Sequence, residues 1–209
     1  MYVFDLDGTL VESVDAHIAA WVEALRLLGV EARAEDVAPL MGLPARDIAR
    51  FLMPGRAEEL AFLKNRLFLE RHIYGVRAYE DSEVLAELPK PIAVVTSSSG
   101  YVARRVLELV GLVKYVDLVL GGDEVPRGKP APDPLYVVER ALGVPARDMV
   151  VVGDSDYDME MAKAAGARAV CIARRKPCKN ADVVIATLYE LLGGTRGPRQ
   201  PHLRDMGKT

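Results

Sequence analysis

Residues 2–10, YVFDLDGTL, hold a short apolar run that ends in two aspartates two positions apart. A continuous apolar run of this length is typical of a strand covered on both faces. Side chains two positions apart in a strand point to the same side, so Asp5 and Asp7 can reach one ligand. Gly8 then allows a tight exit from the strand. The stretch therefore predicts a buried strand with an acidic site at its carboxyl end.

Five later runs have the same apolar, β-branched texture and alternate with helical stretches, which indicates a mostly parallel sheet flanked by helices. One helix is predicted to start at Asp133-Pro134 and to stop at Gly143. The predicted fold class is α/β and Rossmann-like. The predicted strands are Tyr2 to Leu6, Ile92 to Thr96, Val116 to Leu120, Met149 to Gly153, Ala169 to Ala173 and Val183 to Ile185.

Residues 14–77, between the first two strands, have a different pattern. Apolar residues recur there at helical spacing, and further helical stretches run near 45–52 and 57–72, without a strand-like run. We expect an all-helical insertion that stands over the sheet, with hinges at Val11 to Val14 and Gly75 to Tyr79. The first helical stripe, which ends at Gly29, consists of Ile18, Trp21, Val22, Leu25 and Leu28.

The predicted organisation is a core domain of residues 1–13 and 78–192, the insertion 14–77, and a flexible tail from 193 to 209. A net charge of -3 leaves no basic surplus for a phosphate backbone, so no nucleic-acid partner is expected. No run approaches the roughly 20 apolar residues of a membrane span, and no basic and apolar leader precedes the first strand. We expect a cytoplasmic protein, monomeric or dimeric.

Cys171 and Cys178 are too few for a disulfide framework and have no metal-site spacing, so two unlinked thiols are expected. The alternative is a bond between them. Asparagine and glutamine together number only three, and arginine far outnumbers lysine, a composition that resembles that of thermophiles. Intracellular disulfides do occur in such organisms.

Two further strand ends carry groups suited to an anion. Thr96, Ser97 and Ser98 offer hydroxyls and loop amides for phosphate oxygens. Lys129 stands in the proline-rich stretch GKPAPDP, which holds its charge in place. Each signal alone also fits a helix cap or a solvated lysine, but their occurrence at successive strand ends favours a site.

A third strand end is acidic. Asp154, Asp156 and Asp158 follow the run VVVG and offer hard oxygen ligands of the kind that suit magnesium. Carboxylates that lie close together repel one another unless a cation or a shared proton relieves the repulsion. This predicts a divalent metal ion at the site. Of the first pair, one carboxylate can stay ionised as a nucleophile, while its neighbour, with a raised pKa, keeps its proton as a general acid.

Together these motifs resemble the haloacid dehalogenase-like hydrolase superfamily, whose pattern is D-x-D-G-T, a strand-ending Ser or Thr, a Lys, and G-D-S-x-x-D. The resemblance covers residues 1 to about 192 and implies that the insertion is a type-one helical cap. It implies a Mg²⁺-dependent phosphatase that hydrolyses a small phosphorylated metabolite, phosphoglycolate-like or a sugar phosphate, through an aspartyl-phosphate.

The resemblance also implies residue roles. Asp5 would be the nucleophile, and Asp7 would protonate the leaving oxygen, activate water and touch the metal through its backbone carbonyl. Lys129 would shield Asp5 and hold the phosphoryl group together with the hydroxyl loop, Thr96, Ser97 and Ser98. The implied metal ligands are Asp5, Asp7, Asp154 and Asp158.

Relatives within the superfamily differ at these positions. Dehalogenases and phosphonate-cleaving members lack the second acid, so Asp7 argues against both. β-Phosphoglucomutase is the main alternative, because HIAAW at 17–21 and LKNRLF at 63–68 resemble its cap segments. Its Lys-Asn and E-D-S-x-x-G are replaced by Ser99-Gly100 and G-D-S-x-x-D here, which favours the phosphoglycolate phosphatase-like group. A non-catalytic binding or regulatory member is a third reading.

In the insertion, Arg46 and Lys64 are the expected substrate-facing cations. His17 and Trp21 lie one helical turn apart. All four residues also fit solvated or intra-cap packing positions, and Trp21 fits the core better than a contact.

Overall fold

The structure, a computed structural model, describes residues 1–193 and is built around a six-stranded sheet of order β5-β4-β1-β6-β7-β8. Every neighbouring pair in this sheet is parallel, which confirms the α/β prediction. All six predicted strands are present, most of them shorter than predicted. Their bounds are β1 Tyr2–Phe4, β4 Ile92–Val95, β5 Leu118–Leu120, β6 Val150–Gly153, β7 Arg168–Ile172 and β8 Val183–Ile185. The predicted tail, apart from Gly193, lies outside the described residues.

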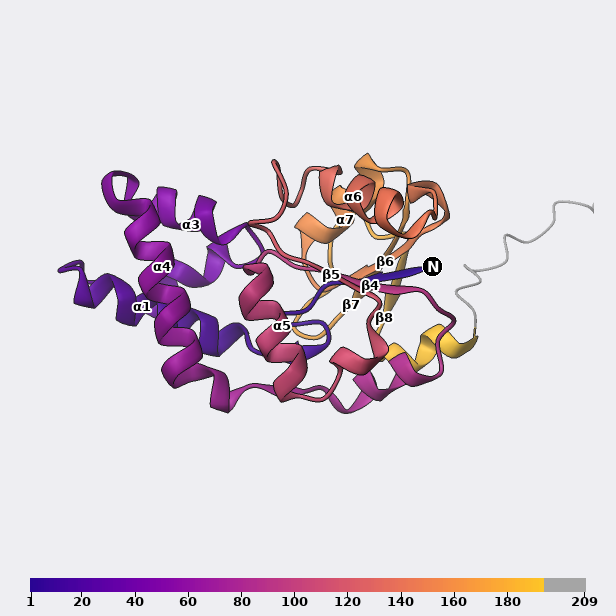
Figure 1. Ribbon diagram of the computed structural model, residues 1–209, viewed down its shortest axis with the longest axis horizontal. Helices are drawn as coiled ribbons and strands as arrows, with labels where there is room; N and C mark the ends of the chain where they lie inside the picture. The colour runs from indigo at the N-terminus through magenta and orange to yellow at the C-terminus, as the bar shows by residue number, and fades with distance from the viewer. Residues whose placement is uncertain (194–209) are drawn as a thin grey trace, which may run out of the picture.

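Successive residues of the central strands pack on opposite faces of the sheet. Val3 joins the cluster that contains α6 (Asp133–Leu142) and α7 (Asp156–Ala164), whereas Phe4 joins the one that contains α5 (Gly100–Leu109). Figure 1 shows α6 and α7 on one side of the sheet and α5 on the other. Because both faces are covered, the strands are continuously apolar. Short 3-10 helices complete the core at Glu80–Ala86, Val113–Tyr115, Ala146–Asp148 and Leu188–Gly193.

The helices between β2 (Val11–Glu12) and β3 (Arg77–Ala78), residues 14–75, form a separate unit that we call the cap (Figure 1). Its apolar side chains, Trp21 and Leu60 among them, make a cluster of their own. The longer elements are α1 Val14–Leu27, α2 Ala34–Val37, α3 Ala45–Leu52, α4 Ala57–Leu67 and the π-helical turn Phe68–His72. Short 3-10 turns lie at Ala38–Leu40, Pro54–Arg56 and Ile73–Gly75. The predicted residue limits of the two domains stay a prediction.

Two short strands join the cap to the core. β2 (Val11–Glu12) pairs antiparallel with β3 (Arg77–Ala78), and the Tyr79 amide donates to the Leu10 carbonyl. Both strands fall within the predicted hinges, although the pairing itself was not expected. The chain therefore enters and leaves the cap at one place.

The two cysteines differ from the prediction. Cys171 and Cys178 form a disulfide with Cα atoms 5.8 Å apart, so the expectation of unlinked thiols is wrong. The chain turns back after β7, and the Cys178 amide donates to Cys171 Sγ. Among the described helices, none combines the length and apolar composition needed to cross a membrane. The cytoplasmic location and the thermophilic source stay predictions.

Candidate active site

The predicted catalytic residues meet in one pocket between the cap and the carboxyl edge of the sheet. Asp5 follows β1, Thr96 follows β4 and Asp154 follows β6, because parallel strands bring their carboxyl ends to the same edge. The cavity has a volume of about 540 Å³. Its lining includes the predicted residues Asp5, Asp7, His17, Trp21, Lys64, Thr96, Ser97, Ser98, Lys129, Asp154, Asp156 and Asp158.

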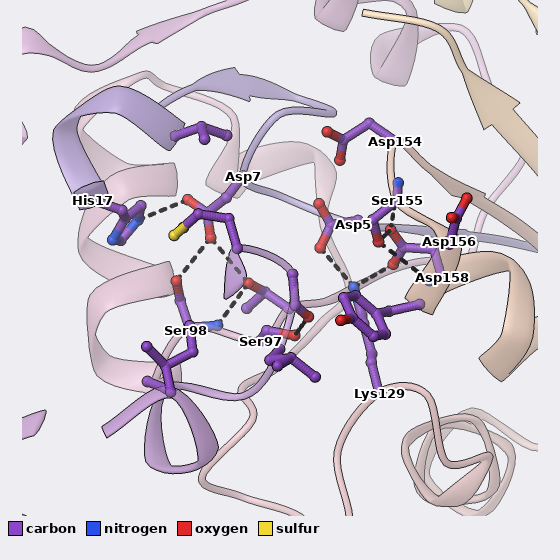
Figure 2. A pocket seen from close by; sticks show the side chains of 18 of the residues that line it. Asp5, Asp7, His17, Ser97, Ser98, Lys129, Asp154, Ser155, Asp156 and Asp158 are labelled. Carbon is purple, nitrogen blue, oxygen red and sulfur yellow. Dashed lines mark hydrogen bonds and ion pairs between the residues drawn. The ribbon is translucent and has the colours of Figure 1, made fainter. Parts of the chain in front are cut away.

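Lys129 links two carboxylates at the base of this pocket. Its Nζ lies 2.6 Å from Asp5 Oδ1 and 2.6 Å from Asp158 Oδ1, and Figure 2 shows it between them. Burial would lower the pKa of Lys129, but the charges of Asp158 and Asp5 raise it above its usual value. The ammonium therefore stays charged. Asp5 Oδ2 accepts no hydrogen bond within residues 1–193.

The acidic residues fit a divalent cation. Asp5, Asp154 and Asp158 each offer a ligand atom, and these atoms lie within 4.8 Å of one another. Burial and the neighbouring Asp158 raise the pKa of Asp154 to about 7, and burial raises that of Asp5. Asp158 Oδ1 is buried, and it faces the Lys129 ammonium at 2.6 Å. Hard oxygen donors that repel one another suit Mg²⁺, which would relieve the repulsion.

Two glycines make room for these carboxylates. A Cβ at Gly8, whose φ is +91°, would lie 2.5 Å from Asp154 Oδ2, and one at Gly153 would lie 2.3 Å from Asp158 Cγ. The Thr9 hydroxyl donates to Asp154 Oδ1 at 3.2 Å. Gly8 and Thr9 thus position the carboxylate of Asp154, which follows another strand.

Asp7 lies apart from this acidic group. Its carboxylate is the acceptor for four side chains, one of which, His17, belongs to the cap. The donors are Ser13 Oγ at 2.6 Å, His17 Nε2 at 2.9 Å, Ser98 Oγ at 2.8 Å and Thr96 Oγ1 at 3.1 Å (Figure 2 labels Asp7, His17 and Ser98). Its predicted metal contact, through the backbone carbonyl, stays a prediction.

The raised pKa expected for the general acid does not lie on Asp7, the residue that the resemblance implies for that role. Burial would raise the pKa of Asp7, but its interaction with His17 and the hydrogen bonds of Ser13 and Ser98 lower it well below its usual range. The neighbouring Asp5, with fewer donors, has the raised pKa. In this state Asp7 is a carboxylate without a proton to give.

Lys64 reaches Asp7 through His17. Its Nζ lies 2.9 Å from His17 Nδ1 and about 5 Å from the rings of Trp21 and Phe68, with the side chain almost fully buried. An ammonium can only donate, so Nδ1 accepts and the proton of a neutral His17 sits on Nε2, facing Asp7. Burial and Lys64 lower the pKa of His17, and burial lowers that of Lys64 to about 8. With His17 neutral, its hydrogen bond rather than its charge holds Asp7.

The structure does not bring Arg46 into the cavity. Its guanidinium donates to the Pro126 carbonyl at 2.7 Å and to the Val125 carbonyl at 3.3 Å. Two cations that sequence reasoning missed, Arg175 and Lys176, do line the cavity. They follow β7 in the stretch ARRKP, so a polar run at another strand's carboxyl end was the signal that could have found them.

Comparison with known proteins finds similar chains. A protein-family model described as haloacid dehalogenase-like hydrolase matches residues 2–172. A phosphoglycolate phosphatase of Neisseria meningitidis is 32% identical over 191 residues, with 80% of this chain and 77% of that protein covered. Fructose-1-phosphate phosphatase YqaB of Escherichia coli is 30% identical over 80% of this chain and 93% of its own. The crystal structure of CbbY from Rhodobacter sphaeroides in complex with phosphate superposes with a TM-score of 0.79 at 25% identity, covering 91% and 95% of the two chains.

Proposed function

The chain belongs to the haloacid dehalogenase-like hydrolases, within their phosphatase group, and we propose that it hydrolyses a small, anionic phosphate ester through a phosphorylated Asp5. Mg²⁺ held by Asp5, Asp154 and Asp158 would supply positive charge beside the phosphoryl oxygens. The observation that carries the proposal is Lys129 placed between Asp5 and Asp158 in a cavity that Asp5 lines, with Asp5 Oδ1 bound to Lys129 and no hydrogen bond to Asp5 Oδ2 within residues 1–193.

The reaction has two displacements. In the first, Asp5 Oδ2 bonds to phosphorus while the bond to the leaving oxygen breaks, and that oxygen takes a proton from Asp7. In the second, Asp7 accepts a proton from water as the water attacks phosphorus, which frees Asp5 and inorganic phosphate. Lys129 neutralises charge on the phosphoryl oxygens throughout.

Asp7 must be protonated for the first step, although its pKa is low in this structure. Two of its donors, Thr96 and Ser98, are also the hydroxyls expected to bind phosphate. A substrate phosphate that takes these hydroxyls removes two hydrogen bonds from Asp7 and raises its pKa. Substrate binding thereby allows Asp7 to take up the proton that it later donates.

The lining of the cavity as a whole favours a small acidic leaving group. The residues that line it from the cap are mostly apolar, such as Trp21, Met41 and Ile48, and His17 and Lys64, the polar ones among the described residues, hydrogen-bond to each other. Such a surface offers few hydrogen-bond partners to the hydroxyls of a sugar. Arg175 and Lys176 add positive charge at the cavity. A phosphoglycolate-like substrate therefore fits better than a hexose phosphate, which is the second candidate because of the similarity to a fructose-1-phosphate phosphatase.

The test is phosphate release by the purified chain from 2-phosphoglycolate, fructose 1-phosphate, pyrophosphate and p-nitrophenyl phosphate, with Mg²⁺ or with EDTA. We expect Mg²⁺-dependent turnover, abolished in Asp5→Asn, with the highest kcat/KM for 2-phosphoglycolate. Asp7→Asn should accumulate the phosphorylated protein, seen as one added phosphoryl group by intact mass. Transfer between positions of one sugar without free phosphate would indicate a mutase, and no turnover on any substrate would favour a binding protein.

A further inference from the structure

Arg46 joins the cap to the core at a point outside the cavity that holds Asp5. We propose that Arg46 is a positioning residue, which holds the cap closed on the loop that carries Lys129, and that it does not bind the substrate. The inference deepens the proposed function and rests on it for its kinetic part.

The guanidinium of Arg46 spans the boundary between α3 and the core loop after β5. Nη2 donates to the Pro126 carbonyl at 2.7 Å and Nη1 to the Val125 carbonyl at 3.3 Å. Lys129 follows Pro126 by three positions in the same loop. The planar guanidinium of arginine can donate to two successive carbonyls at once, whereas the single ammonium of lysine cannot reproduce this geometry.

The residues just before Arg46 dock on the same core. Pro44 lies against Gly128, where a Cβ would come within 2.7 Å of Pro44 Cγ. The Ala45 amide donates to the Ser97 carbonyl at 3.3 Å, and the Ser97 hydroxyl donates to the Gly42 carbonyl at 2.6 Å. One cap segment, residues 42–46, therefore touches both loops that are expected to hold the phosphoryl group.

Arg46 lies on the far side of this segment from the acidic group. It lines a second cavity, of about 840 Å³, together with Arg50 and Phe62, while Ala45 and Ser97 line both cavities. A substrate bound at Asp5 is therefore separated from Arg46 by the docked segment. When the cap is closed, the two hydrogen bonds of Arg46 hold the cap against the loop that carries Lys129. The effect of Arg46 on the reaction is therefore the same for every substrate.

The experiment compares Arg46→Ala and Arg46→Lys with Arg50→Ala. Arg50 lies one turn further along α3, is exposed, and has a 3.5 Å contact with Asp47, so it is a matched control. We expect Arg46→Ala to lose about tenfold in kcat/KM for both 2-phosphoglycolate and p-nitrophenyl phosphate. Arg46→Lys should recover little of this loss, and Arg50→Ala should equal the parent protein.

A second readout does not depend on activity. Amide hydrogen exchange within 43–47 and 121–131 should speed up in Arg46→Ala, with Tm nearly unchanged, and stay unchanged in Arg50→Ala. A loss confined to 2-phosphoglycolate, with normal exchange, would make Arg46 a substrate ligand and overturn the proposal. If the parent protein hydrolyses neither compound, the proposed function fails. Equal amide hydrogen exchange in Arg46→Ala and Arg50→Ala would separately refute the positioning role of Arg46.

Discussion

His17 Nε2, from the cap helix α1, donates to Asp7 Oδ1 of the core at 2.9 Å. On its other side, the His17 ring accepts from the buried Lys64 and stacks on Phe68, with ring centroids 4.0 Å apart. The proposed acid of the reaction is therefore held by the cap as well as by its own domain. A movement of the cap relative to the core would remove the His17 donor from Asp7.

His17→Phe should lower both activity and stability, because Asp7 loses a donor and Lys64 becomes a buried ammonium without its acceptor. The loss in unfolding free energy should be about 2–3 kcal/mol. Adding Lys64→Met removes the buried charge and should restore most of the stability, but not kcat. Urea unfolding and steady-state kinetics of the single and double variants test this. Additive stability losses would contradict the coupling.

Gly8→Ala should abolish metal binding at the acidic group, because its Cβ would lie 2.5 Å from Asp154 Oδ2. Gly29→Ala is the matched control, since Gly29 also has a positive φ, +83°, but no atom within 4 Å of the added Cβ. Both variants should lose about 1 kcal/mol from backbone strain. Only Gly8→Ala should lose Mn²⁺ binding by electron paramagnetic resonance and at least about a hundredfold in kcat. Equal Mn²⁺ affinity in the two variants would refute the role of Gly8.

Asp81 and Arg174 form a buried pair that anchors the β7–β8 loop. Arg174 donates to both Asp81 oxygens, at 2.9 and 2.6 Å, and to the Thr9 carbonyl at 3.0 Å. Asp81→Ala leaves a buried guanidinium unpaired and should cost about 3–5 kcal/mol of unfolding free energy at pH 7. Asp15→Ala, which breaks an exposed pair with Arg175, should cost less than about 1 kcal/mol.

The contribution of Asp81 should depend on pH. Burial would raise the pKa of Asp81, but the hydrogen bonds from Arg174, the Leu188 amide and Thr187 lower it below its usual value. A lowered folded pKa means that this stabilisation is present above the unfolded pKa, near 4, and is lost as the pH falls through the folded value. The stability gap between the parent protein and Asp81→Ala should therefore narrow below about pH 4 in urea titrations. A constant gap would assign the loss to packing.

Lys176→Ala should raise KM for 2-phosphoglycolate about two- to fivefold, with no change for p-nitrophenyl phosphate, because a cation at the cavity contacts only an anionic leaving group. Lys179→Ala, in the same loop but not lining this cavity, is the control. The rise should shrink with added salt. Equal KM changes for the two substrates would remove Lys176 from leaving-group recognition.

The strands and most core-site residues were predictable because their signals are local. Apolar runs buried on both faces gave the six strands, and parallel strands bring Asp5, Thr96 and Asp154 to one edge whatever the details of packing. The helical cap followed from the 3.6-residue spacing of residues such as Ile18 and Leu25.

The sequence by itself determined which chemical groups stand at the carboxyl edge of the sheet. Only the tertiary structure decided their states: Asp7 is ionised because donors from α1 and from the Thr96 loop surround it, and Arg46 lies outside the cavity because α3 docks on the loop of Lys129. Likewise, Cys171 meets Cys178 because the chain folds back after β7. Hydrogen bonding and burial depend on neighbours tens of residues away in the chain, and residue spacing along a sequence does not specify those neighbours.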